Sequence, residues 1–240
     1  MSTNNYTYTI SEACNNVKML LQAWSQDFKP NNRGIYNRLK KCRNLLLARE
    51  NQKGKLFNSN AIQPIKCIEF IQVDASTCCN IETGTMLSRS KNKIPKFLDT
   101  GFGRRSIKAY TIEFSNKIDL ISVDEFSQQL PHNRKYVFPA LQGFIFDDYF
   151  FVDSDDFFGA TLNGILENPE QAIDFNCCQS TDCCTGEIDY CPTPMLEREF
   201  NVPGYLQSTI ENMAAEEIVK LYRFTKQDTE NDARNETPKS

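Results

Sequence analysis

The spacing of apolar residues near the start of the chain predicts a helical hairpin. A T-x-x-E capping box from Thr9 to Glu12 opens the first helix. The segment 29–34 (KPNNRG) interrupts the pattern, and a second helix follows it. The apolar positions recur at helical intervals, at Ile10, Ala13, Cys14, Val17, Leu21, Trp24 and Phe28 in the first helix and Ile35, Leu39, Cys42 and Leu46 in the second. We therefore expect a hairpin over residues 1–55, with Trp24 in its core.

The periodicity changes to that of β-strands between residues 56 and 175. The segment 64–74 (PIKCIEFIQVD) alternates, which places Ile65 and Ile71 on one face and Ile68 on the other. Segments 106–115 and 117–123, joined at Asn116, read as paired strands, and so do 135–141 and 143–152, with a hairpin turn at Asp147 and Asp148. Segment 159–166 offers one more strand. The middle of the chain is thus predicted to be an antiparallel β-rich unit.

A last amphipathic helix is predicted over residues 204–224. Its apolar face consists of Leu206, Ile210, Met213, Ala214, Ile218 and Leu221. A cysteine-rich connecting loop (176–203) precedes it, and a polar tail (225–240) without a large apolar residue follows, so we expect the tail to be disordered or ordered by a partner. The fold class is α+β: the N-terminal hairpin and the C-terminal helix pack with the central antiparallel β-rich unit.

Composition and length set the class of protein. In 240 residues, 40% apolar and 24% charged residues are typical of a globular chain. No apolar run approaches the roughly 20 residues that cross a bilayer, and the polar start has no signal-peptide pattern, so we expect neither a membrane protein nor an exported one. The ten cysteines therefore favour reduced thiols in a cytoplasmic compartment over a disulfide framework.

Charge is sorted along the chain although the net charge is only −4. Residues 33–55 and 89–108 are strongly basic, whereas 147–170 is acidic with no basic residue. Such asymmetry is typical of complementary faces on a self-assembling subunit or of a basic surface for nucleic acid, and ordinary solvated faces remain an alternative. We select Arg33, Arg38, Lys40, Lys41 and Arg43 as an electrostatic docking strip.

The turn 99–106 (DTGFGRRS) carries Arg104 and Arg105. Its G-F-G resembles a phosphate loop only superficially, because the third glycine and the strand-to-helix context are missing. A basic turn that contacts a neighbouring subunit or a nucleic-acid backbone explains the two arginines equally well, and both readings stay open.

Catalytic motifs are absent from the sequence, and we expect no enzyme and no cofactor. His132 is the single histidine, and no serine elbow, P-loop or H-E-x-x-H occurs. Asp153, Asp155 and Asp156 lie close together in an acidic loop, so a carboxylate-dependent hydrolase or a divalent-ion site is a third reading. The loop lacks the glycine and the closing glutamate of a calcium loop.

Five cysteines fall within sixteen residues, at Cys177, Cys178, Cys183, Cys184 and Cys191. Their C-C-x4-C-C-x6-C spacing fits a structural zinc site imperfectly, because adjacent cysteines cannot easily aim at one ion. A disulfide and free thiols filling a loop are the alternatives, and Cys78 and Cys79 would add ligands if the fold brought them near. An alternative function is therefore a cysteine-rich metal-binding module that contacts nucleic acid through the basic segments.

Several blocks of the chain, taken together, point to a family. The segments RLKKCRNLLLAREN, IKCIEFIQVDASTCC, RSKNKIPKF and TLNGILENPEQAIDF, followed by the helix that leads to QDTENDARN, resemble the head-to-tail connector or ring (adaptor) proteins of crAss-like podoviruses. The resemblance spans most of the chain without a strict signature.

This resemblance implies a structural virion protein that is made in the host cytoplasm. It would form a cyclic homo-oligomer of about twelve copies, stacked between the portal protein and the tail around the DNA exit channel, with no role at a membrane. Ring or tail proteins would be its partners, and any contact with the ejected genome would be directed at the DNA backbone without sequence specificity.

Three features of the residues agree with this role. Unlike-charged segments suit head-to-tail contacts, exposed strand edges would add strands across subunits, and the tail would order on a neighbour. For the tail we select residues 228–235, with Asp228, Asp232 and Arg234 as interface residues.

Overall fold

The computed structural model describes residues 7–24, 30–56, 60–75, 86–99, 107–112, 116–129, 141–154, 157–178 and 194–235. The chain divides into two compact units. The first joins residues 1–47 to residues 193–240, and the second consists of residues 48–192. Residues far apart in sequence thus share the first unit, and the β-rich middle of the chain forms the second.

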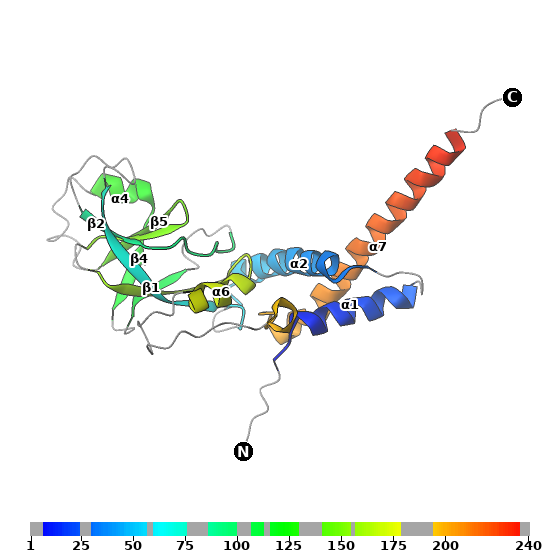
Figure 1. Cartoon of the computed structure of the whole chain (residues 1–240), viewed down its shortest axis with the longest axis horizontal. Helices are drawn as coiled ribbons and strands as arrows, with labels where there is room; N and C mark the ends of the chain where they lie inside the picture. The colour runs from blue at the N-terminus through cyan, green and yellow to red at the C-terminus, as the bar shows by residue number, and fades with distance from the viewer. Residues whose placement is uncertain are drawn as a thin grey trace, which may run out of the picture. The chain divides into compact units, whose positions relative to one another are not determined.

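The first unit contains α1 (Ile10–Trp24), most of α2 (Asn32–Gln52), the 3-10 turn η2 (Met195–Glu197) and α7 (Gly204–Asn235). In Figure 1, α1 lies against the first turns of α7. Its core includes much of the predicted stripes, namely Ile10, Ala13, Cys14, Val17 and Leu21 from α1, Ile35, Leu39 and Cys42 from α2, and Leu206, Ile210 and Ala214 from α7. The helical segments agree with the predicted spacing, but Leu46 is only half-buried whereas Leu47 is fully buried, and Leu221 is 47% exposed. Phe28 lies outside the described residues.

The start of α1 is the predicted capping box. The Thr9 backbone N–H donates to Glu12 Oε2 at 3.0 Å, and the Glu12 N–H donates to Thr9 Oγ1 at 3.2 Å. Backbone bonds also tie this start to the segment before α7, since the Ile10 N–H donates to the Arg198 carbonyl at 3.0 Å. The first helix is thus fixed at the place where the chain returns from the second unit.

Two further expectations for the first unit need correction. Trp24, the last residue of α1, is 61% exposed, so the prediction of a core residue was wrong. The predicted helix end at residue 224 was too early, since α7 continues to Asn235. Residues 225–235 contain no proline or glycine, so no residue in this segment breaks the helix, although the segment has no apolar face.

The second unit is a closed seven-stranded barrel in the order β1-β2-β6-β5-β4-β3-β7. The strands are β1 (Gln63–Asp74), β2 (Met86–Ser90), β3 (Lys108–Thr111), β4 (Lys117–Leu120), β5 (Gln142–Phe146), β6 (Tyr149–Val152) and β7 (Gly159–Gly164). Every pair is antiparallel except β4 with β5. Closure pairs both edges of every described strand, so the expected free strand edges are absent from this part of the chain.

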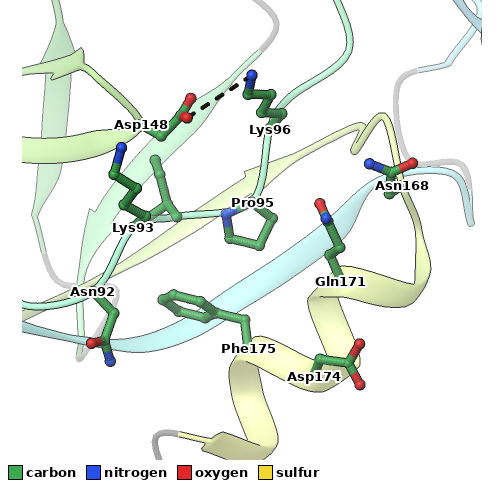
Figure 2. Close-up of a pocket in the computed structure, with 10 residues that line it drawn as sticks. Asn92, Lys93, Pro95, Lys96, Asp148, Asn168, Gln171, Asp174 and Phe175 are labelled. Carbon is green, nitrogen blue, oxygen red and sulfur yellow. Dashed lines mark ion pairs between the residues drawn. The ribbon is translucent and has the colours of Figure 1, made fainter.

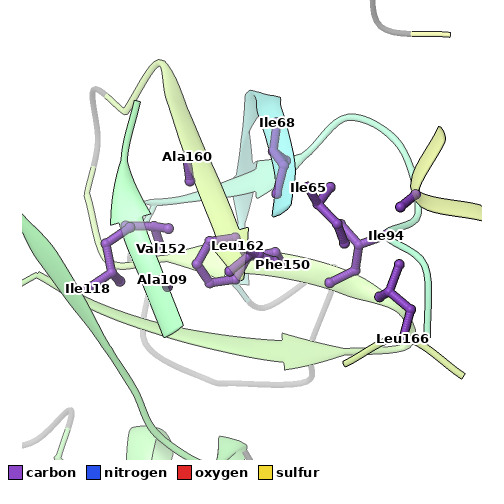
Figure 3. Close-up of a cluster of buried hydrophobic side chains, with 11 residues drawn as sticks. Ile65, Ile68, Ile94, Ala109, Ile118, Phe150, Val152, Ala160, Leu162 and Leu166 are labelled. Carbon is purple, nitrogen blue, oxygen red and sulfur yellow. The ribbon is translucent and has the colours of Figure 1, made fainter. Parts of the chain in front are cut away.

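Inward-facing side chains fill the barrel. Figure 3 shows the interior cluster, which consists of Ile65, Ile68, Ile94, Ala109, Ile118, Phe150, Val152, Ala160, Leu162 and Leu166 together with Ala172. Gly143 on β5 is required by this packing, because a Cβ there would lie 2.8 Å from Phe150 Cε2 and 2.8 Å from the Phe151 carbonyl oxygen. The interior is thus a packed core.

A β-bulge in β1 changes which residues face that core. The register with β7 shifts between Ile65 and Ile68, and Cys67 has a φ of 54°. As a result Ile65 and Ile68 are both fully buried, whereas Ile71 is 39% exposed. The strict alternation expected for this strand was therefore wrong, because one extra residue reverses the faces.

The turn at Asp147 and Asp148 was predicted correctly. Both residues adopt left-handed backbone conformations, with φ of 48° and 63°, as a two-residue hairpin between β5 and β6 requires. Three elements were missed: β2, α4 (Val123–Gln129) and α6 (Glu170–Cys178). The signal for α4 was a second capping box, in which Ser122 Oγ accepts from the Glu125 N–H at 3.1 Å.

The two added helices cover different parts of the barrel. Phe126 of α4 packs on the outer face against Leu87, Phe144 and Phe151. Ala172 of α6 joins the interior cluster, and Gln63 Nε2 donates to the Pro169 carbonyl at 3.0 Å just before α6. Among the described elements, α4 thus covers one region of the outer face, and Ile71 and Phe146 on neighbouring strands are partly exposed.

Candidate interaction surfaces

The predicted docking strip on α2 is in part an intramolecular surface. Arg33 is exposed. Arg38 Nη1 lies 3.6 Å and Lys41 Nζ 3.3 Å from the carboxylate of Glu217 on α7, and Lys40 Nζ lies 5.7 Å from the ring centroid of Tyr36. Exposed ion pairs of this kind contribute about 0–1 kcal/mol, so the strip can exchange partners at little cost. Because Arg38 and Lys41 share one carboxylate, the strip keeps a net positive charge.

Arg43 does not belong to this surface. Its side chain is fully buried, with Nε donating to the Asn201 carbonyl at 3.0 Å and Nη1 donating to Asn44 Oδ1 at 2.9 Å. It therefore links α2 to the segment that enters α7, and a role in electrostatic docking does not fit this position. The sequence could not distinguish the buried Arg43 from its basic neighbours on α2, because all of them lie in the same basic segment.

Basic and acidic residues of the barrel form ion pairs with one another within the second unit. Lys91 Nζ lies 2.9 Å from Glu69 Oε2, Lys93 Nζ lies 3.4 Å from Asp147, and Lys96 Nζ lies 4.0 Å from Asp148 Oδ2. The basic segment after β2 and the acidic turn between β5 and β6 are thus partners in this fold. Contacts between copies are not needed to explain their opposite charge.

A groove of about 640 Å³ lies beside these pairs, between the segment 92–96 and α6 (Figure 2). Its walls mix amides and charges with apolar groups, namely Asn92, Lys93, Ile94, Pro95, Lys96, Asp148, Asn168, Gln171, Asp174 and Phe175. This lining provides hydrogen bonds and a shallow apolar floor. It brings together no nucleophile with a positioned base, which acyl-transfer chemistry would require.

Many of the candidate residues, among them cysteines, acidic residues, the histidine and two arginines, lie outside the described residues. This applies to Cys183, Cys184, Cys191, Cys78, Cys79, His132, Asp155, Asp156, Arg104 and Arg105. Cys177 and Cys178 end α6, and Asp228, Asp232 and Arg234 lie in α7, but only their backbone is described. Asp153 follows β6. Within the described side chains, no three His, Cys, Asp or Glu residues come together as a metal site.

The described thiols differ from one another. Cys14 and Cys42 are free and buried in the first unit, and burial raises the pKa of each thiol to about 11. Cys67, at the β1 bulge, is disulfide-bonded, which corrects the expectation of reduced thiols at that position. The buried pair behaves as small apolar core residues.

Two partly exposed surfaces in the described chain were not predicted from the sequence. One, which we name the barrel patch, consists of Ile71, Arg89, Phe146 and Tyr149 on the outer face of the barrel. The other, which we name the η2 knob, consists of Met195, Leu196 and Glu197 in the first unit. The available signal was weak, since isolated apolar residues on a surface are ordinary.

Partly exposed apolar side chains beside charged ones, on both the helical unit and the closed barrel, are compatible with the class of assembly subunits. The family comparison makes the assignment specific: the chain belongs to the phage tail ring protein 2 family of crAss-like phages, whose model matches residues 12–237. The predicted resemblance is thereby confirmed, and the chain is a structural ring protein of the virion. No curated protein matches the sequence.

Among the helices that the structure describes, none combines the length and the apolar character needed to cross a bilayer.

Proposed function

We propose that this chain is the repeating subunit of a head-to-tail connector ring, stacked between the portal and the tail around the DNA channel. The observation that carries the proposal is the family match over residues 12–237, which includes both structural units. A cyclic ring of about twelve identical copies uses one heterologous contact repeated around the axis. The chain has no catalytic task in this proposal, and it is made in the host cytoplasm before it enters the particle.

The α2 strip of Arg33, Arg38, Lys40 and Lys41 supports this role as a docking surface for a neighbouring layer or copy. Two of its four cations, Arg38 and Lys41, share the Glu217 carboxylate, so the pair keeps a net positive charge. The end of α7, with Asp228, Asp232 and Arg234, is proposed to engage a neighbour by the same polar chemistry. The turn of Arg104 and Arg105 is proposed as a further basic contact.

The test is assembly of the purified chain, alone and with the portal protein of the same phage, followed by mass photometry and negative-stain microscopy. We expect closed rings of one copy number, either free or seated on the portal. A strict monomer in both conditions, at every concentration up to about 100 μM, would refute the connector role.

Charge reversal separates docking from folding in the same assay. Replacing Arg33 and Lys40 with glutamate should weaken seating on the portal and leave the far-UV circular dichroism spectrum unchanged. The matched control is Lys220→Glu, because Lys220 is an exposed lysine on α7 that pairs with Glu216 at 3.9 Å and lies outside the strip. Equal loss in both variants would contradict a specific role for the strip. A DNA duplex added at rising salt tests backbone contact, since its affinity should fall steeply.

A further inference from the structure

The barrel patch has the composition of a binding hot spot. Ile71 and Phe146 are 39% and 41% exposed, and Arg89 and Tyr149 lie between them on the intervening strands. Aromatic residues and arginine are the types enriched at the energetic centres of protein interfaces. The strand order β1-β2-β6-β5 places the four side chains on one continuous outer surface beside the α4-covered region.

The charge at the centre of this patch is uncompensated in the described chain. The Arg89 guanidinium carbon lies 4.5 Å from the centroid of the Tyr149 ring, and Lys93 Nζ lies 5.3 Å from the same centroid. Lys93 is paired with Asp147, whereas Arg89 has no carboxylate within ion-pair distance among the described residues, and its Nε has no hydrogen-bond acceptor. A cation held on an aromatic ring with apolar flanks fits an apolar segment that carries a carboxylate.

The η2 knob in the first unit has that chemistry. Met195 and Leu196 are 42% and 36% exposed, and Glu197 and Glu199 are exposed at the same place. Neither glutamate has an ion-pair partner among the described residues. Backbone bonds brace the knob, since the Glu197 N–H donates to the Pro194 carbonyl at 2.9 Å. A braced knob loses little conformational freedom when it docks.

We propose that the η2 knob of one copy docks on the barrel patch of the next copy, with Glu197 paired to Arg89 and the two apolar knob residues seated between Ile71 and Phe146. The two surfaces differ and lie on different units, so the contact is heterologous, which is the type that closes a ring. The knob is too small to supply a whole interface and acts as its anchor. This inference rests on the proposed ring and names the contact that joins its copies.

The experiment compares self-assembly of Arg89→Glu, Glu197→Arg and an equimolar mixture of the two variants with that of the wild type. Each single variant should weaken assembly about tenfold or more, because it opposes like charges at a contact centre. In the mixture, alternating copies restore an opposite-charge pair at every contact, and assembly should return. Arg49→Glu and Glu216→Arg are the matched controls, since both residues are exposed and lie outside the two surfaces.

The outcomes separate this inference from the connector role. Wild-type rings that neither single variant weakens would overturn the docking contact and leave the ring intact. Weak single variants without rescue in the mixture would also overturn it, because the pair would then lie within one chain. Should Arg89→Glu fail to fold by circular dichroism, a Met195→Asp and Leu196→Asp double variant tests the exposed knob, and unchanged assembly would count against docking. A wild type that never assembles refutes the connector role, and this inference with it.

Discussion

Replacing Arg43 with alanine is the most direct test of whether this arginine is structural. The guanidinium is fully buried and donates to the Asn201 carbonyl and to Asn44 Oδ1. A hydrogen bond from a charged donor contributes about 1.5–3 kcal/mol, and truncating a large buried side chain costs about 2–5 kcal/mol. Removing a buried charge returns part of that cost, because its desolvation penalty disappears. We expect a net loss of about 2–4 kcal/mol in the free energy of unfolding.

Urea unfolding provides the measurement. Fluorescence of Trp24, the single tryptophan, reports on the first unit, and far-UV circular dichroism follows the helices in parallel. At an m-value of about 2 kcal/mol/M, the expected loss lowers the urea midpoint by about 1–2 M. Arg33→Ala is the matched control and should stay within about 0.5 kcal/mol of the wild type, because Arg33 is exposed. The free energy of unfolding of Arg43→Lys should lie between those of Arg43→Ala and the wild type, because lysine keeps the positive charge but lacks the planar guanidinium that makes both hydrogen bonds.

One outcome would refute a structural role for Arg43. If Arg43→Ala unfolds with the wild type and instead weakens only assembly, then Arg43 is a docking residue after all. In that case Arg43 would be buried in the isolated chain but exposed to a partner in the assembled ring.

Three further predictions follow from the described residues. Gly143→Ala should destabilise the barrel by about 1–3 kcal/mol through overlap with Phe150, seen as a lower melting temperature, whereas an unchanged melt would contradict the close packing. Thr9→Ala should lower the free energy of unfolding, measured in urea, by about 1 kcal/mol, because it removes the cap of α1. A loss below about 0.3 kcal/mol would contradict the role of the cap. Folded Cys14 and Cys42 keep their protons to about pH 11, whereas unfolded thiols ionise near pH 9. Unfolding therefore releases protons in this range, and stability should fall as the pH rises from about 9 to about 11, less steeply in a variant with both thiols replaced by alanine.

Local pattern was sufficient for the elements whose faces are set by one period. The stripe of α1, the capping box at Thr9 and the turn at Asp147 all depend on residues within a few positions of one another. The site was less predictable than the fold. Of the five residues chosen for the α2 strip, Arg43 lies inside the protein, and nothing within its own helix distinguishes it from Arg38 or Lys41.

The amino-acid sequence alone determined that this chain has helical ends around a β-rich middle, because hydrophobic period and turn chemistry act over short distances. Only the tertiary structure decided the rest. Closure of the barrel removed the strand edges, a bulge at Cys67 reversed the faces of β1, and Arg43 found its acceptor 158 positions away at Asn201. Each of these outcomes depends on which distant segments meet, and burial of a charge or pairing of a strand edge is an energy shared with a partner that no local pattern specifies.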